Sequence, residues 1–288
     1  YFIKDDHPSD KIKRQEREKE LDEVDIPFPG WDSLDKEMIE STNQAIIVIR
    51  DSVGKIIDQL TQPLKKGINN ANWDLKQPFG TTVNIDSKNN KISTWRFNVK
   101  DGNYTAQLFK RIAWQTVKLS EPVSFKVKRI RTNVLSNPLA SETEAYTKKL
   151  VALRKELNII EHHFDKASKL LEKFEKTLKF TTSNQIALTK EVYALLTEMH
   201  DLKMRLYGSA AKKEVGEKEE LSISDRINFA ASGLDGNSYG QTKLHVENYD
   251  IAKTIFEELK PKLEKFSIEK VPDLGKKLEL SGAPTVLD

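Results

Sequence analysis

Histidines and carboxylates are the side chains of this sequence that could bind a metal ion. His162 and His163 are adjacent, and consecutive side chains on a helix point about 100° apart, so the two rings cannot share one ion. Asp165 follows them closely, whereas His200 and His245 fall in other predicted helices. None of these spacings is typical of a metal site. The sequence therefore predicts no metal, and it predicts that His245 lies half-buried beside the core.

Residues for acid, base or nucleophilic catalysis do not form a recognisable set. Glu18 with Glu20, and Glu219 with Glu220, belong to runs of mixed charge, so neither pair is held at a fixed separation. There is no Gly-x-Ser-x-Gly motif, and the 12 glycines are scattered rather than gathered in a phosphate-binding loop. We therefore expect no cofactor and no catalytic site in this chain, although catalysis elsewhere in a larger protein stays open.

Two serines fit a modification pattern. Ser33 and Ser52 each follow an aspartate and precede an apolar residue. This order resembles the Asp-Ser/Thr-apolar pattern of O-glycosylation in extracytoplasmic proteins of Bacteroidota, and the alternative is that both serines are ordinary turn residues. Asn103 begins an Asn-Tyr-Thr triplet, which is an N-glycosylation sequon in a predicted hairpin turn.

The four tryptophans allow two interpretations. Trp31, Trp95 and Trp114 are candidate platforms on which a glycan could stack, because an aromatic ring offers a flat apolar face. Trp73 and Trp95 lie in alternating strand patterns, so the competing interpretation makes them core residues. The sequence does not decide between stacking and packing for Trp95.

Composition limits the class of partner. The 288 residues include 47 basic and 44 acidic side chains, and the net charge of +3 is too small and too interspersed to indicate nucleic-acid binding. No run approaches the roughly 20 apolar residues that span a bilayer, so no transmembrane segment is predicted. There are no cysteines, which excludes disulfides and thiolate sites but does not indicate a compartment. We expect protein partners and leave the oligomeric state open.

The elements that must position these residues begin with a connector over residues 1–40. Its mixed charges predict a solvated helix or an extended arm. Tyr1-Phe2-Ile3 resembles the end of a strand whose partners are missing, and the absence of an initial methionine suggests a fragment or a processed chain. Pro27 to Trp31 predicts a rigid turn that ends in an aromatic anchor.

Residues 41–130 are predicted to form a fibronectin III-like or immunoglobulin-like β-sandwich. Short strands with turn signals every 8–12 residues favour this fold. Asp51-Ser-Val-Gly54 predicts the first hairpin. The expected strands cover residues 45–50, 55–60, 67–75, 93–99, 104–109, 112–119 and 123–127.

Residues 131–288 are predicted to form an antiparallel helical bundle, which makes the chain an α+β multidomain protein. Ser141 to Leu178 carries an apolar residue alternately every four and three positions, and Ser141 with Glu144 forms a capping-box pattern. Further helices are expected over residues 185–207, 222–234, 241–266 and 271–280, with a kink or division at Pro261 and a mobile loop over residues 212–220. His162 and His163 lie on the outward face of the first helix, which we interpret as a partner surface.

Taken in order, these segments resemble the C-terminal region of sortilin-like, BNR-repeat, glycosyl-hydrolase-like β-propeller proteins found outside the bacterial cytoplasm. The residues that carry the resemblance are Ile26-Pro-Phe-Pro-Gly-Trp31, Ile49-Arg-Asp-Ser-Val-Gly54, Gly67-Ile-Asn-Asn-Ala-Asn-Trp-Asp-Leu-Lys76, Asp101-Gly-Asn-Tyr-Thr105 and Gly282-Ala-Pro284. Asp101 stands where the family has proline. The resemblance implies a propeller before Tyr1, to which the hydrolase label belongs, so no catalytic residue is carried over.

The resemblance implies a location at the periplasm or cell surface, in association with the outer membrane. From it we expect a non-catalytic accessory or scaffold region that docks in a cell-envelope assembly. A second hypothesis is the tail of a glycosidase or peptidase with its catalytic site upstream, in which the sandwich assists glycan binding. A third is a stand-alone coiled-coil oligomer.

Overall fold

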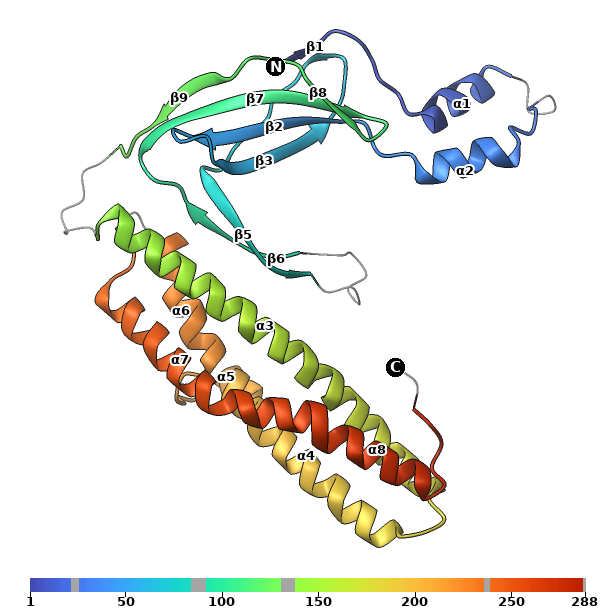
Figure 1. Cartoon of the computed structure of the whole chain (residues 1–288), viewed down its shortest axis with the longest axis vertical. Coiled ribbons are helices and arrows are strands. Elements are labelled where there is room, and N and C mark those ends of the chain that lie inside the picture. Colours follow the sequence, from blue (N-terminus) through green and yellow to red (C-terminus); the bar gives the residue numbers. More distant parts are fainter. Residues whose placement is uncertain (22–25, 84–91, 131–137, 236–238, 287–288) are drawn as a thin grey trace. The chain divides into compact units, whose positions relative to one another are not determined.

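The structure, a computed structural model, describes residues 1–21, 26–83, 92–130, 138–235 and 239–286. It combines α and β structure, with antiparallel sheets followed by a helical C-terminal region (Figure 1). The chain forms two compact units, a first unit of residues 1–78 and 98–132 and a second unit of residues 79–97 and 133–288. The expected division at residue 130 differs from this one, because residues 79–97 pack with the helices.

The first unit is built on a five-stranded antiparallel sheet. Its strand order is β3-β2-β7-β8, and β9 also pairs with β7. Because β2 lies between two strands and is buried on both faces at Ala45, Ile46, Val48 and Ile49, it is the central strand. The bounds are β2 Gln44–Asp51, β3 Ile56–Pro63, β7 Gly102–Ile112, β8 Gln115–Lys118 and β9 Val123–Val127.

The predicted hairpin between β2 and β3 is confirmed. The Asp51 N–H donates to the Lys55 carbonyl at 3.0 Å, and the Gly54 N–H donates to the Asp51 carbonyl at 3.1 Å. Asp51 Oδ1 also accepts the N–H groups of Val53 and Lys55. Gly54 has φ +83°, a left-handed conformation that glycine adopts without a steric penalty.

The N-terminal strand has its partner within this chain. β1 (Phe2–Ile3) pairs antiparallel with β4 (Gly67–Ile68), so the expectation that its partners are missing is wrong. Ile3 is buried against Ala45 of the central strand and Leu64. The two short strands therefore form a small second layer on the five-stranded sheet.

An aromatic cluster covers another part of the sheet. Trp73 meets Tyr104 and Phe125 edge to face, with ring centroids 5.7 and 6.0 Å apart. The predicted strand 67–75 is wrong beyond Ile68, because the chain turns to bring Trp73 onto the sheet and Leu75 takes a positive φ of 58°. Trp73 is half-buried there, as the packing interpretation expects.

The second unit begins with most of a hairpin of β5 (Lys76–Val83) and β6 (Ile92–Asn98), which forms its own two-stranded sheet. Phe97 is buried in the helical core, and Phe79 and Trp95 pack against it. The sequence did not predict β5, since Pro78 and Gly80 are unfavourable inside strands.

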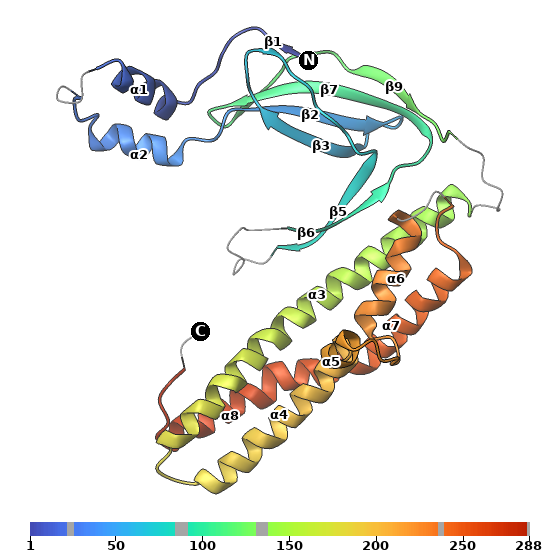
Figure 2. The same ribbon diagram turned by 180° about the vertical axis from the view of Figure 1, so that it is seen from behind.

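The helices of the second unit follow the predicted periodicity closely. Every stripe residue from Tyr146 to Phe174 on α3 is buried, and so is every predicted stripe residue of α4. α3 packs against α4, α6, α7 and α8, and the long helices lie side by side in both views (Figures 1 and 2). The bounds are α3 Ala140–Thr177, the 3₁₀ turn η1 Leu178–Phe180, α4 Gln185–Tyr207, α5 Ala210–Glu214, α6 Ile223–Asp235, α7 Lys243–Glu264, the π-helical η2 Lys265–Lys270 and α8 Val271–Leu280.

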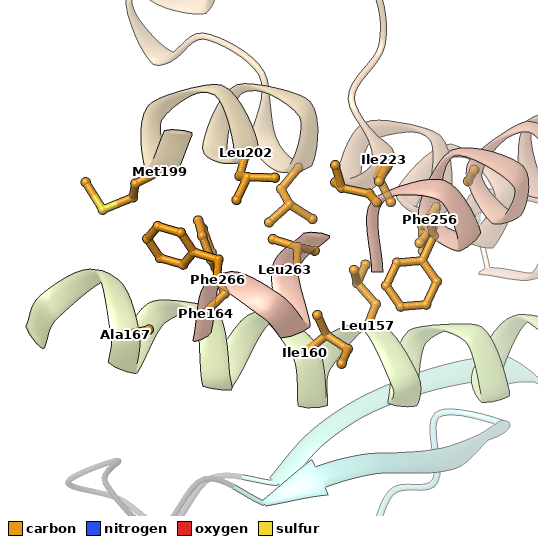
Figure 3. Close-up of a cluster of buried hydrophobic side chains, with 14 of the residues drawn as sticks. Leu157, Ile160, Phe164, Ala167, Met199, Leu202, Ile223, Phe256, Leu263 and Phe266 are labelled. Atoms are coloured by element: carbon orange, nitrogen blue, oxygen red, sulfur yellow. The ribbon is translucent and has the colours of Figure 1, made fainter. Parts of the chain in front are cut away.

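Side chains from four helical elements meet in the middle of the core (Figure 3). Phe164 of α3 lies 5.3 Å from Phe266 of η2, measured between ring centroids. Leu202 of α4 and Leu263 of α7 are buried in the same cluster. A fully buried phenylalanine such as Phe164 contributes several kcal/mol, since its removal typically costs about 3–5 kcal/mol.

Three details of the helices differ from expectation. α3 begins before Ser141, because the Glu142 carboxylate accepts the Leu139 N–H at 2.8 Å and caps the helix there. The predicted loop 212–220 contains the end of α5, whose start is capped by the Ser209 hydroxyl accepting the Lys212 N–H. Part of this segment is also tied down by an ion pair from Lys213 to Asp225 at 2.9 Å.

The third difference concerns Pro261. α7 continues through this residue to Glu264, and the departure from α geometry comes later, in η2. Pro261 is exposed, so the backbone carbonyl that loses its partner can be hydrated at little cost. η2 ends just before Pro272, which has no N–H to donate to the Ile268 carbonyl. The backbone therefore departs from α-helical geometry in η2, close to Pro272, and the helix is not divided at Pro261.

Candidate docking surface

A group of exposed apolar side chains lies on and beside α2 (Trp31–Ile39) in the first unit. Trp31 is 72% exposed and Met38 is 84% exposed. These residues are seven apart, so they lie on the same side of the helix. We call the set Phe28, Trp31, Met38, Ile39 and Trp114 the α2 face.

The start of α2 explains why Trp31 points outward. Gly30 precedes the helix with φ +84°, a conformation that suits glycine. Phe28 lies edge to face with Trp31, with ring centroids 5.1 Å apart, yet both rings remain exposed. The aromatic residue at the end of this turn is therefore on the surface of the unit.

Another side of α2 is held by α1 (Asp10–Lys19). α1 is a solvated helix, which is one of the two structures predicted for this segment. The Arg14 guanidinium donates to both oxygens of Glu37, at 2.7 and 2.8 Å, and to Glu18 at 2.7 Å. Its hydrogen bonds lower the pKa of Glu37 below the usual range for a carboxyl. The Glu40 carboxylate accepts the N–H of Asp10. α1 therefore fixes the orientation of α2 and leaves the α2 face open.

Trp114 joins the α2 face from a strand turn. Ala113 and Trp114 both have positive φ, 46° and 68°, in the tight turn between β7 and β8. The Trp114 N–H donates to the Ser41 hydroxyl at 3.1 Å, and its indole N–H donates to the Ile39 carbonyl at 3.3 Å. The ring is 73% exposed. Trp114 is thus fixed at the C-terminal end of α2, whereas Trp31 lies at its N-terminal end.

The three tryptophans proposed for glycan stacking do not come together. Trp114 contacts Ile39, at the C-terminal end of α2. Ile39 is eight residues after Trp31, which corresponds to roughly 12 Å along a helix. Trp95 lies in the second unit, half-buried, with its ring 5.7 Å from that of Phe97. Two exposed rings therefore lie at opposite ends of α2, and the third packs against the helical core.

The candidate modification sites are accessible. Ser33 is exposed on α2, and Ser52 is exposed at the tip of the β2–β3 hairpin. Asn103 is exposed as well, although it lies within β7, where it pairs with Lys126, and not in the hairpin turn.

His162 and His163 lie on α3 as predicted, with ring centroids 5.8 Å apart. His163 is exposed and borders a small groove of about 170 Å³ that Ile159 and Ile268 also line. His162 is half-buried near Asp165, and burial raises the pKa of Asp165 while neighbouring cations oppose that rise. Within the described residues, no group of three or more His, Cys, Asp or Glu side chains could hold a metal ion.

Sequence reasoning found Trp31 and Trp114 but missed Phe28, Met38 and Ile39. The available signal was the spacing of seven between Trp31 and Met38, which is typical of one helix face. His245, predicted to be half-buried, is buried and its Nδ1 accepts the Thr242 N–H at 2.9 Å, capping α7.

Comparison with known proteins finds no matching family model, curated protein or solved structure. In the ranges that the structure describes, no helix is both long enough and apolar enough to cross a membrane.

Proposed function

We propose that this chain is a non-catalytic docking region of an extracytoplasmic propeller protein, and that it binds a protein partner of a cell-envelope assembly through the α2 face. The observation that carries the proposal is the exposure of five large apolar side chains on and beside one short helix. The three aromatic rings together expose on the order of 300–500 Å² of apolar surface.

The chemistry of the α2 face favours a basic partner. Asp35 is exposed between Trp31 and Met38 and has no ion pair within the described residues. Pairing two copies of α2 antiparallel would bring the two Asp35 carboxylates together, which is unfavourable. A partner protein with an apolar groove that also carries a lysine or arginine would instead bind the aromatic rings of the α2 face and pair with the Asp35 carboxylate. This is the helix-in-groove mode of recognition.

A photo-crosslinking experiment tests this function. A photoreactive amino acid replaces Met38 in the parent protein inside its native cells, and Val53, also 84% exposed in the first unit, serves as the matched control position. We expect one discrete crosslinked protein from position 38, lost in a Trp31→Glu background. Crosslinking that is absent, or equal at the two positions, contradicts the proposal.

We also propose that the first unit is a reduced fibronectin III-like or immunoglobulin-like sandwich. The order β8-β7-β2-β3 corresponds to the G-F-C-C′ sheet of that fold. The Tyr104 hydroxyl at the start of β7 donates to the Lys100 carbonyl at 2.7 Å, which resembles the tyrosine corner. Tyr104→Phe should lower stability by about 1 kcal/mol. A Tyr104→Phe variant as stable as the wild type would count against the corner.

For the second unit we propose an antiparallel helical bundle. Its support is the burial of the stripes of α3, α4 and α7 against one another within the unit. Since these stripes are already covered, we do not propose oligomerisation through a coiled coil. Sedimentation of the isolated chain as a dimer that Trp31→Glu leaves intact would contradict this view.

Glycan binding is the second candidate function, favoured by the exposed rings of Trp31 and Trp114 at the two ends of α2. Rings at the two ends of a helix whose end positions are roughly 12 Å apart along its axis could contact separate sugar units of one chain. A glycan array compares the wild type with Trp31→Ala/Trp114→Ala. Binding that survives in the double variant excludes this role for the α2 face.

A further inference from the structure

A cleft of about 430 Å³ opens between the first turns of α3 and α7 in the second unit. Its apolar side includes Val246 and two tyrosines, Tyr146 and Tyr249, whose rings meet edge to face at 5.9 Å. The Tyr146 hydroxyl lies 3.1 Å from the Ala230 and His245 carbonyls, so that ring is fixed. The cleft is within the size range of small-molecule sites.

Polar groups on the α7 side of this cleft lack protein partners. Gln241 Oε1 is buried and accepts no hydrogen bond from the described residues. The Asp250 carboxylate, also lining the cleft, has no ion pair among those residues. Asp250 is exposed, so its carboxylate is accessible to a ligand that supplies N–H donors.

The opposite wall carries the complementary charge. Lys149 of α3 lines the cleft and is exposed. Within the described residues it forms no salt bridge, neither with Asp250 nor with another carboxylate. Two further charged residues line the cleft, namely Lys243, which is 92% exposed and lies 3.7 Å from Glu247, and Glu142, which caps α3 through the Leu139 N–H. Lys149 of α3 and Asp250 of α7 therefore line the same cleft from two helices and do not pair with each other.

We propose that this cleft binds a small zwitterion, namely an amino acid or short peptide with a free ammonium and a free carboxylate. The ammonium would donate to Asp250, the carboxylate would pair with Lys149, and an apolar side chain would lie on Tyr249 and Val246. A ligand carrying only one charge would leave Lys149 or Asp250 unpaired. This inference concerns the second unit and is independent of the α2 face.

Calorimetric titration of the whole chain with the dipeptide Leu-Leu tests the proposal. We expect the wild type to bind Leu-Leu. Its affinity for N-acetyl-Leu-Leu and for Leu-Leu amide should each be about tenfold lower, because each modification removes one charge-assisted contact. Asp250→Asn should weaken the free peptide to a similar extent while no longer distinguishing it from the N-acetylated form. Lys149→Gln should likewise weaken binding of Leu-Leu, and this variant should no longer distinguish Leu-Leu from Leu-Leu amide.

Matched controls lie on the same unit. Asp201→Asn on α4 and Lys155→Gln on α3 change exposed charges that do not line the cleft, and both should bind Leu-Leu as the wild type does. Because the blocked peptides are compared on the wild type, the test does not depend on any variant folding. No binding at millimolar Leu-Leu, equal binding of the blocked peptides, or equal binding of the neutral disaccharide cellobiose overturns the proposal.

Discussion

Asn158 of α3 donates a hydrogen bond from Nδ2 to the Thr81 hydroxyl at 2.9 Å, joining a helix to a strand 77 residues earlier in the chain. The same amide lies 3.1 Å from the Thr82 hydroxyl and 3.3 Å from the Ser93 hydroxyl. A single side chain thus holds both strands of the β5–β6 hairpin against the helical core.

Replacing Asn158 with leucine should loosen this hairpin. The amide contacts are lost while the side-chain volume is kept, so we expect a destabilisation of about 1–3 kcal/mol, local to the hairpin. Amide hydrogen exchange should accelerate in residues 79–83 and 92–97 more than in α4. Lys155→Leu, one turn earlier on the exposed side of α3, should leave the hairpin unchanged. Uniform acceleration across the whole unit would contradict this local role.

Phe164 should be among the most sensitive core positions. Its ring is fully buried beside Phe266, so Phe164→Ala should cost about 3–5 kcal/mol, seen as a lower midpoint in thermal unfolding of the helical signal. Ile159→Ala, on the exposed side of the same helix, should cost much less. Similar losses in the two variants would mean that the core is not packed as described.

Gly275 of α8 should not tolerate a methyl group, although alanine usually favours a helix. A Cβ at this position would lie 2.6 Å from Cζ of Phe174. Gly275→Ala should therefore destabilise the second unit by about 1–3 kcal/mol in denaturant unfolding. Adding Phe174→Leu should recover part of that loss because it removes the ring. If the double variant is no better than the sum of the single changes, the contact is not the cause.

His245 should make stability fall at acidic pH. Burial lowers its pKa below the ordinary value of 6.5, so the unfolded chain binds the proton more tightly than the folded one. The stability that neutral His245 provides is present above about pH 6.5 and is lost as pH falls through the lower, folded-state pKa. Protonation would also end the hydrogen bond that Nδ1 accepts from Thr242.

Urea unfolding between pH 5 and pH 8 measures this effect, with His245→Gln as the variant, because glutamine at this helix position can still accept the capping hydrogen bond. The pH dependence in this range should shrink in His245→Gln. His200→Gln, exposed on α4, should keep it. An unchanged pH profile in the His245 variant would rule the residue out as its source.

Trp31→Ala and Met38→Ala should have little effect on folding. Both side chains are exposed, and surface substitutions usually change stability by within about 0.5 kcal/mol. Thermal unfolding of each variant should match the wild type even where partner crosslinking is lost. A large drop in stability would show that the α2 face is covered in the folded chain.

Much of the second unit is predictable because a helix is a local structure. The four-and-three spacing from Tyr146 to Phe174 predicts which side chains turn inward, and α4 has the predicted bounds Gln185–Tyr207. Strand pairing is also partly local, as the Asp51–Gly54 hairpin shows. The exact start of α3 was missed because Ser141 and Glu142 both offer capping groups, and only the backbone conformation selects Glu142.

The sequence by itself therefore determined the helices, their inward stripes and most of the strands, because periodicity and turn chemistry act over a few residues. Only the tertiary structure decided that residues 79–97 pack with the helices, that Trp95 is half-buried while Trp31 and Trp114 are exposed, and that Lys149 and Asp250 face one cleft. These outcomes depend on contacts between residues far apart in the chain. No local pattern specifies which of several apolar surfaces a distant segment will cover.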